Sequence, residues 1–315
     1  MKRLIALALC AVLLTGVFAG CASAQPEKSE KTLRVVATIF PIYDWCREIL
    51  GDTDAIQLEL LLDQGVDLHS YQPSASDIVK ITSCDLFLFV GGESDNWVKE
   101  VLQQAQNPEL IALNLLDILG EAVKEESLVE GMQSEAEEEP AADEHVWLSL
   151  KNAEWVCRAL DETLCALDPK NASSYSANSA FYIDRLAALD ERYAAAAASA
   201  KQNTLLFADR FPFRYLVDDY GLNYYAAFSG CSAETEASFE TVIFLANKVD
   251  DLGLSVILQL EDADGTMART IRDATQSKDQ TILALNSMQS VRNAKDQHYL
   301  TIMEQNLDVL QKALQ

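Results

Sequence analysis

Short runs of β-branched and aliphatic residues alternate with segments at helical spacing along most of the chain. Residues 33–39 (LRVVATI) have the continuous apolar character of a buried parallel strand, and residues 43–50 (YDWCREIL) follow at helical spacing. Strands that alternate with helices are joined by right-handed crossovers, which favours a mostly parallel sheet. We therefore predict an α/β fold, and a chain of 315 residues has room for about two such domains.

One strongly helical stretch divides the predicted elements into two groups. Residues 171–202 are rich in Ala and other helix-forming residues, which predicts a rod of roughly 48 Å at 1.5 Å per residue. A helix of this length exceeds what one domain needs, so we expect it to join two lobes. The predicted layout is an N-terminal lobe at 33–168, a connecting helix at 169–202 and a C-terminal lobe at 203–315. Strands are predicted at 33–39, 56–62, 86–90, 204–208, 222–228, 255–260 and 281–285, and the other helices at 43–50, 76–81, 97–104, 213–220, 239–252, 267–274 and 299–314.

The chain is strongly acidic, with 24 basic and 49 acidic residues and a formal charge of −25. This charge repels phosphate backbones and leaves no basic stripe, so we expect no nucleic-acid partner. The densest acidic stretch, residues 121–144, holds ten carboxylates against one Lys. It is too poor in bulky apolar residues to fold on its own and predicts a mobile loop, which either holds cations loosely or has no binding role.

The N-terminus has the features of a secretory signal. Lys2 and Arg3 precede an apolar run at 4–14 that is too short to span a membrane, and small residues follow it, so we predict a signal peptide at 1–20. The sequence FAGC at 18–21 resembles the lipobox of bacterial lipoproteins, which implies that Cys21 carries a lipid. Residues 21–32 would then be a flexible tether, and the protein would be extracytoplasmic and anchored to the cell membrane. The alternative is an ordinary secretory signal with an incidental cysteine.

Five further cysteines follow Cys21, and they form no C-x-x-C pair. A zinc ribbon and a redox motif are therefore unsupported. Small buried hydrophobes are the expected role for most of these thiols, and pairing among them is left open. The five are Cys46, Cys84, Cys157, Cys165 and Cys231.

The chain has only three histidines, and two of them stand among carboxylates. His69 lies in DLHSYQPSASD (67–77) and His145 in DEHVWLSLKNA (143–153). Neutral imidazole is the commonest ligand for a cation such as Zn²⁺, and open α/β sheets bind ligands at the carboxyl ends of their strands. Taken alone, each of these histidines is more often a structural or surface residue than a metal ligand. His298, at the start of the last predicted helix, is expected to be a surface residue.

Five blocks of sequence occur in the order seen in one known family: VVATIFPIYDWCREILGD (35–52), DLHSYQPSASDI (67–78), DEHVWLSLKNAEWV (143–156), LDPKNASSYSAN (167–178) and YLTIMEQNLDVLQKAL (299–314). Together they resemble the metal-binding solute receptors of bacterial ABC importers for zinc and manganese, the ZnuA and TroA-like group. The resemblance implies two parallel-sheet α/β lobes bridged by one long helix, the class III periplasmic-binding-protein type. It also implies a monomeric lipoprotein, not an enzyme, that captures a divalent cation and delivers it to an ABC transporter permease.

The resemblance assigns the first two metal ligands to His69 and His145. At the third position it aligns Ala208, which has no lone pair, so Asp209 is our substitute. Asp209 has a structural alternative, either an ion pair with Arg210 or a helix cap.

The fourth ligand position aligns with Asn286, whose carbonyl oxygen is a weak partner for zinc. Glu261 and Asp262 are other reachable acids, although solvated loop charges are the commoner role for such residues.

This predicted ligand set favours zinc over manganese, because Mn²⁺ prefers more oxygen donors. A manganese receptor and a divergent paralogue remain open. A zinc-dependent hydrolase, with Glu261 as its base, is the alternative from another class, but H-E-x-x-H, G-x-S-x-G and a phosphate-binding Gly loop are all missing from the sequence. A surface adhesin is a third class, for which no residue specifies a partner.

Overall fold

The computed structural model describes residues 32–133, 141–232 and 237–315, and residues 33–315 form one compact unit. The predicted signal peptide, the lipidation site Cys21 and nearly all of the predicted tether lie outside the described residues, as do residues 134–140 of the acidic loop. Among the helices that are described, none is long and apolar enough to cross a membrane.

The N-terminal lobe is built on a four-stranded parallel sheet with the strand order β2-β1-β3-β4. The central strands β1 and β3 are almost entirely apolar and largely buried, as the sequence predicts for a parallel sheet with helices on its faces. The elements are β1 (Leu33–Ala37), α2 (Phe40–Leu50), β2 (Ile56–Leu60), α3 (Ala75–Ser83), β3 (Leu86–Phe89), α4 (Val98–Leu102), β4 (Ile111–Asn114) and α5 (Leu115–Leu119).

The C-terminal lobe repeats this architecture with the strand order β6-β5-β7-β8, again fully parallel. One hydrophobic cluster contains buried residues from both lobes, from Val35 to Leu314. The elements are β5 (Thr204–Phe211), α8 (Arg214–Asp219), β6 (Asn223–Ser229), α9 (Phe239–Leu252), β7 (Val256–Leu260), α10 (Thr266–Ala274), β8 (Thr281–Leu285) and α11 (Tyr299–Ala313).

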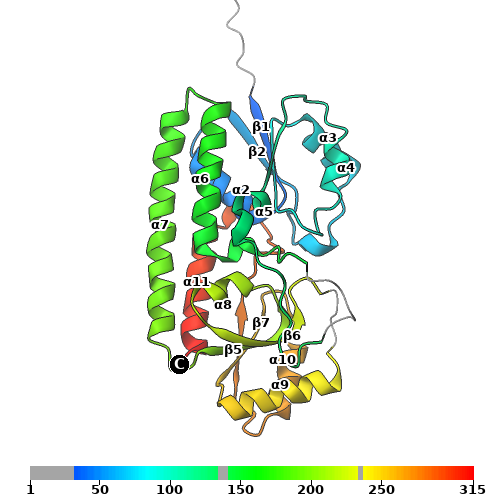
Figure 1. Cartoon of the computed structure of the whole chain (residues 1–315), viewed down its shortest axis with the longest axis vertical. Helices are drawn as coiled ribbons and strands as arrows, with labels where there is room; N and C mark the ends of the chain where they lie inside the picture. The colour runs from blue at the N-terminus through cyan, green and yellow to red at the C-terminus, as the bar shows by residue number, and fades with distance from the viewer. Residues whose placement is uncertain (1–31, 134–140, 233–236) are drawn as a thin grey trace, which may run out of the picture. The chain divides into compact units, whose positions relative to one another are not determined.

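Two long helices, α6 (Leu150–Leu167) and α7 (Ala172–Ala198), connect the lobes. Helix α7 runs beside both lobes and packs along α6, α2 and α11 (Figure 1). Asn178 of α7 donates to the carbonyl of Ile49 in α2, and the hydroxyl of Tyr193 donates to the carbonyl of Met303 in α11. The long helix is thus bonded to both lobes, and the predicted two-lobed fold bridged by one long helix is confirmed.

The structure adds three elements that the sequence analysis did not predict. Strand β4 is an edge strand whose residues are exposed or half-buried, so it lacks the apolar run that marks a buried strand. Helices α5 and α6 were also not predicted, although α6 begins with a standard cap in which the Ser149 hydroxyl accepts from the Asn152 amide. Helix α7 spans 27 residues and is shorter than the predicted stretch 171–202.

The described part of the acidic loop is held against the C-terminal lobe, in contrast to the mobile loop that its composition predicts. Its backbone forms bridges between Glu125 and Ala142 and between Gln133 and Phe228. The Glu126 carboxylate also accepts a hydrogen bond from the backbone amide of Cys231. Backbone pairing and a carboxylate that accepts from an amide require no apolar core, so composition alone does not reveal these contacts.

Candidate metal centre

His145 is completely buried, and its ring orientation is set by the preceding acidic residue. Asp143 Oδ1 accepts from the backbone amide of His145 at 2.9 Å and from His145 Nδ1 at 2.8 Å. Because an ionised carboxylate only accepts, Nδ1 carries the proton and Nε2 presents its lone pair. Carboxylates orient metal-binding histidines in this way.

His69 lies in a short 3₁₀ turn, Leu68–Ser70, that Asp67 caps by accepting from the His69 amide at 2.9 Å. His69 Nδ1 lies 2.8 Å from Ser94 Oγ, so its second nitrogen, Nε2, faces away from this contact. Burial, followed by the proximity of His145, lowers the pKa of His69 to about 3. The ring is therefore neutral at physiological pH, the form in which imidazole binds metal ions.

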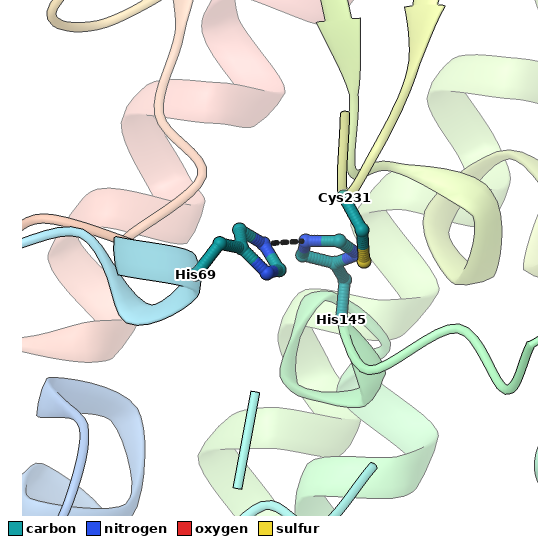
Figure 2. A group of neighbouring side chains, drawn as sticks. All are labelled: His69, His145 and Cys231. Atoms are coloured by element: carbon teal, nitrogen blue, oxygen red, sulfur yellow. Dashed lines mark hydrogen bonds between the residues drawn. The ribbon is translucent and has the colours of Figure 1, made fainter. Parts of the chain in front are cut away.

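The two imidazoles meet, with their Nε2 atoms 3.1 Å apart (Figure 2). Two nitrogens that each lie ~2.0–2.1 Å from a tetrahedral zinc ion are separated by about 3.3 Å. The observed separation is close to this value, so the pair fits a shared cation. The sequence analysis predicted this meeting of two residues that stand 76 positions apart.

Cys231 is the third potential donor here, and it follows the end of β6 (Figure 2). Donor atoms of His69, His145 and Cys231 all lie within 4.8 Å of one another. The chain can approach so closely because residue 230 is glycine: a Cβ on Gly230 would lie 2.8 Å from His145 Cε1. The sequence analysis did not single out this thiol, although its position just after an apolar strand was a usable signal.

The Gln289 side chain also contacts both histidines. Its Nε2 lies 2.7 Å from His69 Nε2 and 2.8 Å from His145 Nε2. The side chain is buried, and its Oε1 atom has no hydrogen-bond partner among the described residues. The Gln289 amide thus contacts both imidazoles through Nε2, while its buried Oε1 is left without a hydrogen bond among the described residues.

Asp209, our predicted third ligand, has a different role in the structure. It belongs to no group of three potential donors among the described residues. Its carboxylate accepts from the backbone amides of Arg210 at 2.8 Å and Leu260 at 3.1 Å, at an irregularity in the pairing of β5 with β6. Arg210 instead reaches Asp67, with an N–O distance of 2.9 Å. The prediction of Asp209 as a ligand is therefore not supported, because its oxygens are committed to backbone amides.

Glu261 and Asn286, the two candidates for the fourth position, hold the turn that precedes Gln289. Glu261 accepts from the amide and hydroxyl of Ser287 and from the amide of Met288, and Asn286 Oδ1 also accepts from Met288. Met288 has a φ of 58°, which is strained for a residue other than glycine and needs such support. These two residues thus hold the turn before Gln289, and the part of the chain that the structure describes places neither of them in a group of potential donors with the two histidines.

His298, expected at the surface, is exposed and forms a separate cluster with Asp44 and Glu48. Arg47 contacts the Asp44 carboxylate, and its Nη2 lies 3.2 Å from His298 Nδ1. The Arg47 guanidinium offsets the charge of one of the two acids, Asp44, and its positive charge disfavours a metal ion there.

A cavity of about 970 Å³ opens beside the metal centre, with Gln289 in its wall. Five carboxylates and two guanidinium groups line it, and this acidic excess attracts cations towards the centre. The charged lining residues are Asp67, Asp209, Glu261, Asp262, Asp264, Arg210 and Arg292.

Known proteins share both the sequence pattern and the fold. The zinc-binding lipoprotein AdcA of Streptococcus pneumoniae is 28% identical over 305 residues, which cover 96% of this chain and 59% of AdcA. The chain thus spans less than two thirds of that relative. The high-affinity zinc uptake system protein ZnuA of Bacillus subtilis is 27% identical over 99% of this chain and 97% of its own length.

A solved structure agrees with these relatives. The crystal structure of the Zn(II)-bound ZnuA-like domain of Streptococcus pneumoniae AdcA superposes with a TM-score of 0.71 at 26% identity, covering 90% of this chain and 99% of that domain. The profile of the ZnuA family, described as zinc-uptake complex component A, periplasmic, matches residues 35–313. With nearly the whole described fold inside that match, the chain belongs to the ZnuA family.

Proposed function

We propose that this protein is an extracytoplasmic receptor that captures Zn²⁺ and delivers it to an ABC transporter permease. The observation that carries the proposal is the pair of buried imidazoles whose Nε2 atoms lie 3.1 Å apart. Asp143 fixes the protonation of His145, and burial keeps His69 neutral, so both rings are prepared to donate to one ion. The family and the names of its zinc-binding relatives support the same reading.

Zinc is our choice over manganese because of the nature of the donors. Two imidazoles and a nearby thiol suit a borderline-soft cation with four ligands, whereas Mn²⁺ favours oxygen donors. The receptor needs no bond-breaking step, so we propose that it is not an enzyme. Its work is to exchange the ion's hydration shell for protein ligands and to give the ion up when it docks on the permease.

Helix α7 limits how the lobes move during capture and release. Its hydrogen bonds to α2 and α11 join it to both lobes, so we expect local shifts of the site loops instead of a wide hinge motion. We further propose that Cys21 carries a lipid that anchors a monomeric receptor to the membrane, as the N-terminal sequence indicates.

Calorimetric titration of the metal-stripped protein with Zn²⁺ tests the proposal. We expect one ion to bind per chain, and we expect His69→Ala and His145→Ala each to lose most of the affinity. His298→Ala is the matched control, since it removes the third histidine of the chain, which is exposed, and should bind like the wild type. Heat indistinguishable from buffer in the wild type, or wild-type affinity in the double variant of His69 and His145, would refute the proposal.

The hydrolase alternative needs Glu261 as its base. The Glu261 carboxylate already accepts three hydrogen bonds from Ser287 and Met288, which argues against this role. Metal-dependent turnover in an esterase, peptidase and phosphatase screen would restore it. The adhesin alternative stays a prediction, for which no described residue specifies a partner.

A further inference from the structure

We propose that the zinc ion is held by four protein donors, His69 Nε2, His145 Nε2, the Cys231 thiolate and the Gln289 amide oxygen. This inference rests on the proposed zinc-binding function and adds the identity of the third and fourth ligands. It replaces the carboxylate predicted as the third ligand with a thiolate and places an amide oxygen at the fourth position.

The position of Cys231 is the first argument. Its backbone amide donates to Glu126 Oε1 at 3.0 Å, and the preceding Gly230 lies against the His145 ring. The main chain that leads to the thiol is thus fixed, which leaves mainly rotation about χ1 to move Sγ. Donor atoms of the three residues already lie within 4.8 Å of one another, and a tetrahedral zinc site needs a nitrogen–sulfur separation of about 3.6 Å.

The other cysteines beyond the tether have no such surroundings. Cys46, Cys84 and Cys157 are buried, and each belongs to a cluster of hydrophobic core residues. The Cys165 thiol contacts Asp161 and Ser176, on α6 and α7. Cys231 is therefore the one thiol of the described residues that lies beside imidazole donors.

The Gln289 amide is the second, independent argument. The Nε2 atoms of His69 and His145 lie 3.1 Å apart, and when both carry lone pairs, as zinc binding requires, they repel unless a positive group lies between them. The Gln289 NH₂ group is neutral, but its two hydrogens carry partial positive charge, and it can donate one to each Nε2 atom at 2.7 and 2.8 Å. The amide nitrogen thus serves the two rings as the cation would.

The Gln289 amide also contains an oxygen, Oε1, that can bind the cation. Its Oε1 atom is buried and has no partner among the described residues. Rotating the amide by half a turn exchanges oxygen and nitrogen, so that Oε1 faces the ion. The turn that precedes it, held by Glu261 and Asn286, keeps the side chain in place while the amide rotates.

A thiolate in the ligand set has a consequence for selectivity. Sulfur ligands favour zinc and other thiophilic cations, whereas Mn²⁺ favours carboxylates and water. The set His69, His145, Cys231 and Gln289 carries a single negative charge when zinc is bound, from the thiolate alone. We expect the receptor to discriminate strongly against manganese.

Cobalt substitution gives a readout that depends on sulfur and not on affinity. Co²⁺ added to the metal-stripped protein under anaerobic conditions should give a thiolate-to-metal charge-transfer band and the intense visible bands of a tetrahedral site. Cys231→Ser should abolish the charge-transfer band, whereas the matched control Cys165→Ser should keep it. Gln289→Leu should keep the band and change the visible spectrum as water replaces the amide oxygen.

Competition with a chromophoric chelator measures the affinities. Losing even a partner that orients a metal ligand costs ~10–100-fold, so we expect Cys231→Ser to lose at least about 100-fold in zinc affinity. Cys231→Asp should bind Mn²⁺ better relative to Zn²⁺ than the wild type does. Circular dichroism of each variant excludes loss of the fold as the cause.

The outcomes separate this inference from the proposed function. Wild-type protein that binds zinc through His69 and His145, shows no charge-transfer band and loses nothing in Cys231→Ser would overturn the inference and leave the function standing. Wild-type protein that binds no zinc would overturn both.

Discussion

Substituting Gly230 by alanine tests whether the end of β6 sets the geometry of the metal centre. The new Cβ would lie 2.8 Å from His145 Cε1, 3.1 Å from His145 Nδ1 and 3.0 Å from the Phe211 carbonyl oxygen. Ordinary contact begins near 3.4 Å, so the ring must retreat by about 3.4 − 2.8 = 0.6 Å. His145 is completely buried and hydrogen-bonded to Asp143 at 2.8 Å, so it cannot move this far without weakening that bond.

The expected result is a loss of zinc affinity with a retained fold. Disturbing the partner that orients a ligand costs ~10–100-fold in metal affinity, and overpacking costs roughly 1–3 kcal/mol in the free energy of unfolding. Chelator competition measures the affinity, and urea denaturation of the metal-free protein measures the stability.

Gly221→Ala is the matched control for a glycine substitution in the same lobe. Gly221 has a φ of +64° and no heavy atom within 4 Å of an added Cβ. It should therefore lose stability through backbone strain, by about 1 kcal/mol, and keep wild-type zinc affinity. The reasoning fails if Gly230→Ala binds zinc as tightly as the wild type, or if Gly221→Ala loses affinity to the same extent.

Three further predictions follow from the same region. Asp143→Asn should lower zinc affinity ~10–100-fold while the protein stays folded. The reason is that an amide can donate to His145 Nδ1 and so favour the tautomer with the proton on Nε2, which cannot bind the ion. Chelator competition measures the affinity, and wild-type affinity in this variant would contradict the prediction. Burial raises the pKa of Asp95 to about 7, so the stability that this carboxyl contributes at low pH is lost as the pH rises from ~4 through 7. The Tm of Asp95→Asn minus the Tm of the wild type should therefore be larger at pH 8 than at pH 5, and a difference independent of pH would contradict this. The lowered pKa of His69 has the opposite effect, because it destabilises the fold as the pH falls below the ordinary value of 6.5. This effect is present in both proteins and cancels in the comparison. Burial, and after it the negative charge of Glu126, raises the pKa of the Cys231 thiol, so the metal-free thiol is protonated at pH 7. Zinc binding at pH 7 should therefore release about one proton in the wild type and none in Cys231→Ser. Calorimetric titrations in buffers of different ionisation enthalpy measure this release.

The fold could be predicted from the sequence because the central strands of its two sheets are largely buried. Continuous apolar runs mark β1 and β3, and the alanine-rich stretch marks α7. Strand β4 was not predicted because it lies at a sheet edge and its residues are exposed or half-buried, so it has no apolar run. The described part of the acidic loop differed from expectation because backbone bridges and the Glu126 carboxylate hold it, and composition does not reveal such pairing.

The site could be predicted only in part. His69 and His145 were identified because both stand among carboxylates in sequence blocks that resemble those of a metal-binding family. Asp209 and Glu261 were also predicted as possible ligands. The Asp209 carboxylate, however, accepts a hydrogen bond from a backbone amide at a strand irregularity, and the Glu261 carboxylate accepts one at a strained turn. Which acids are committed in this way depends on local backbone geometry, and one sequence does not contain that information.

The most direct test is a crystal structure of the zinc-loaded protein, with anomalous diffraction recorded on both sides of the zinc absorption edge. We predict one strong zinc peak, ~2.0–2.1 Å from the Nε2 atoms of both His69 and His145. A peak bound elsewhere, or one that touches only one of the two imidazoles, would contradict the account.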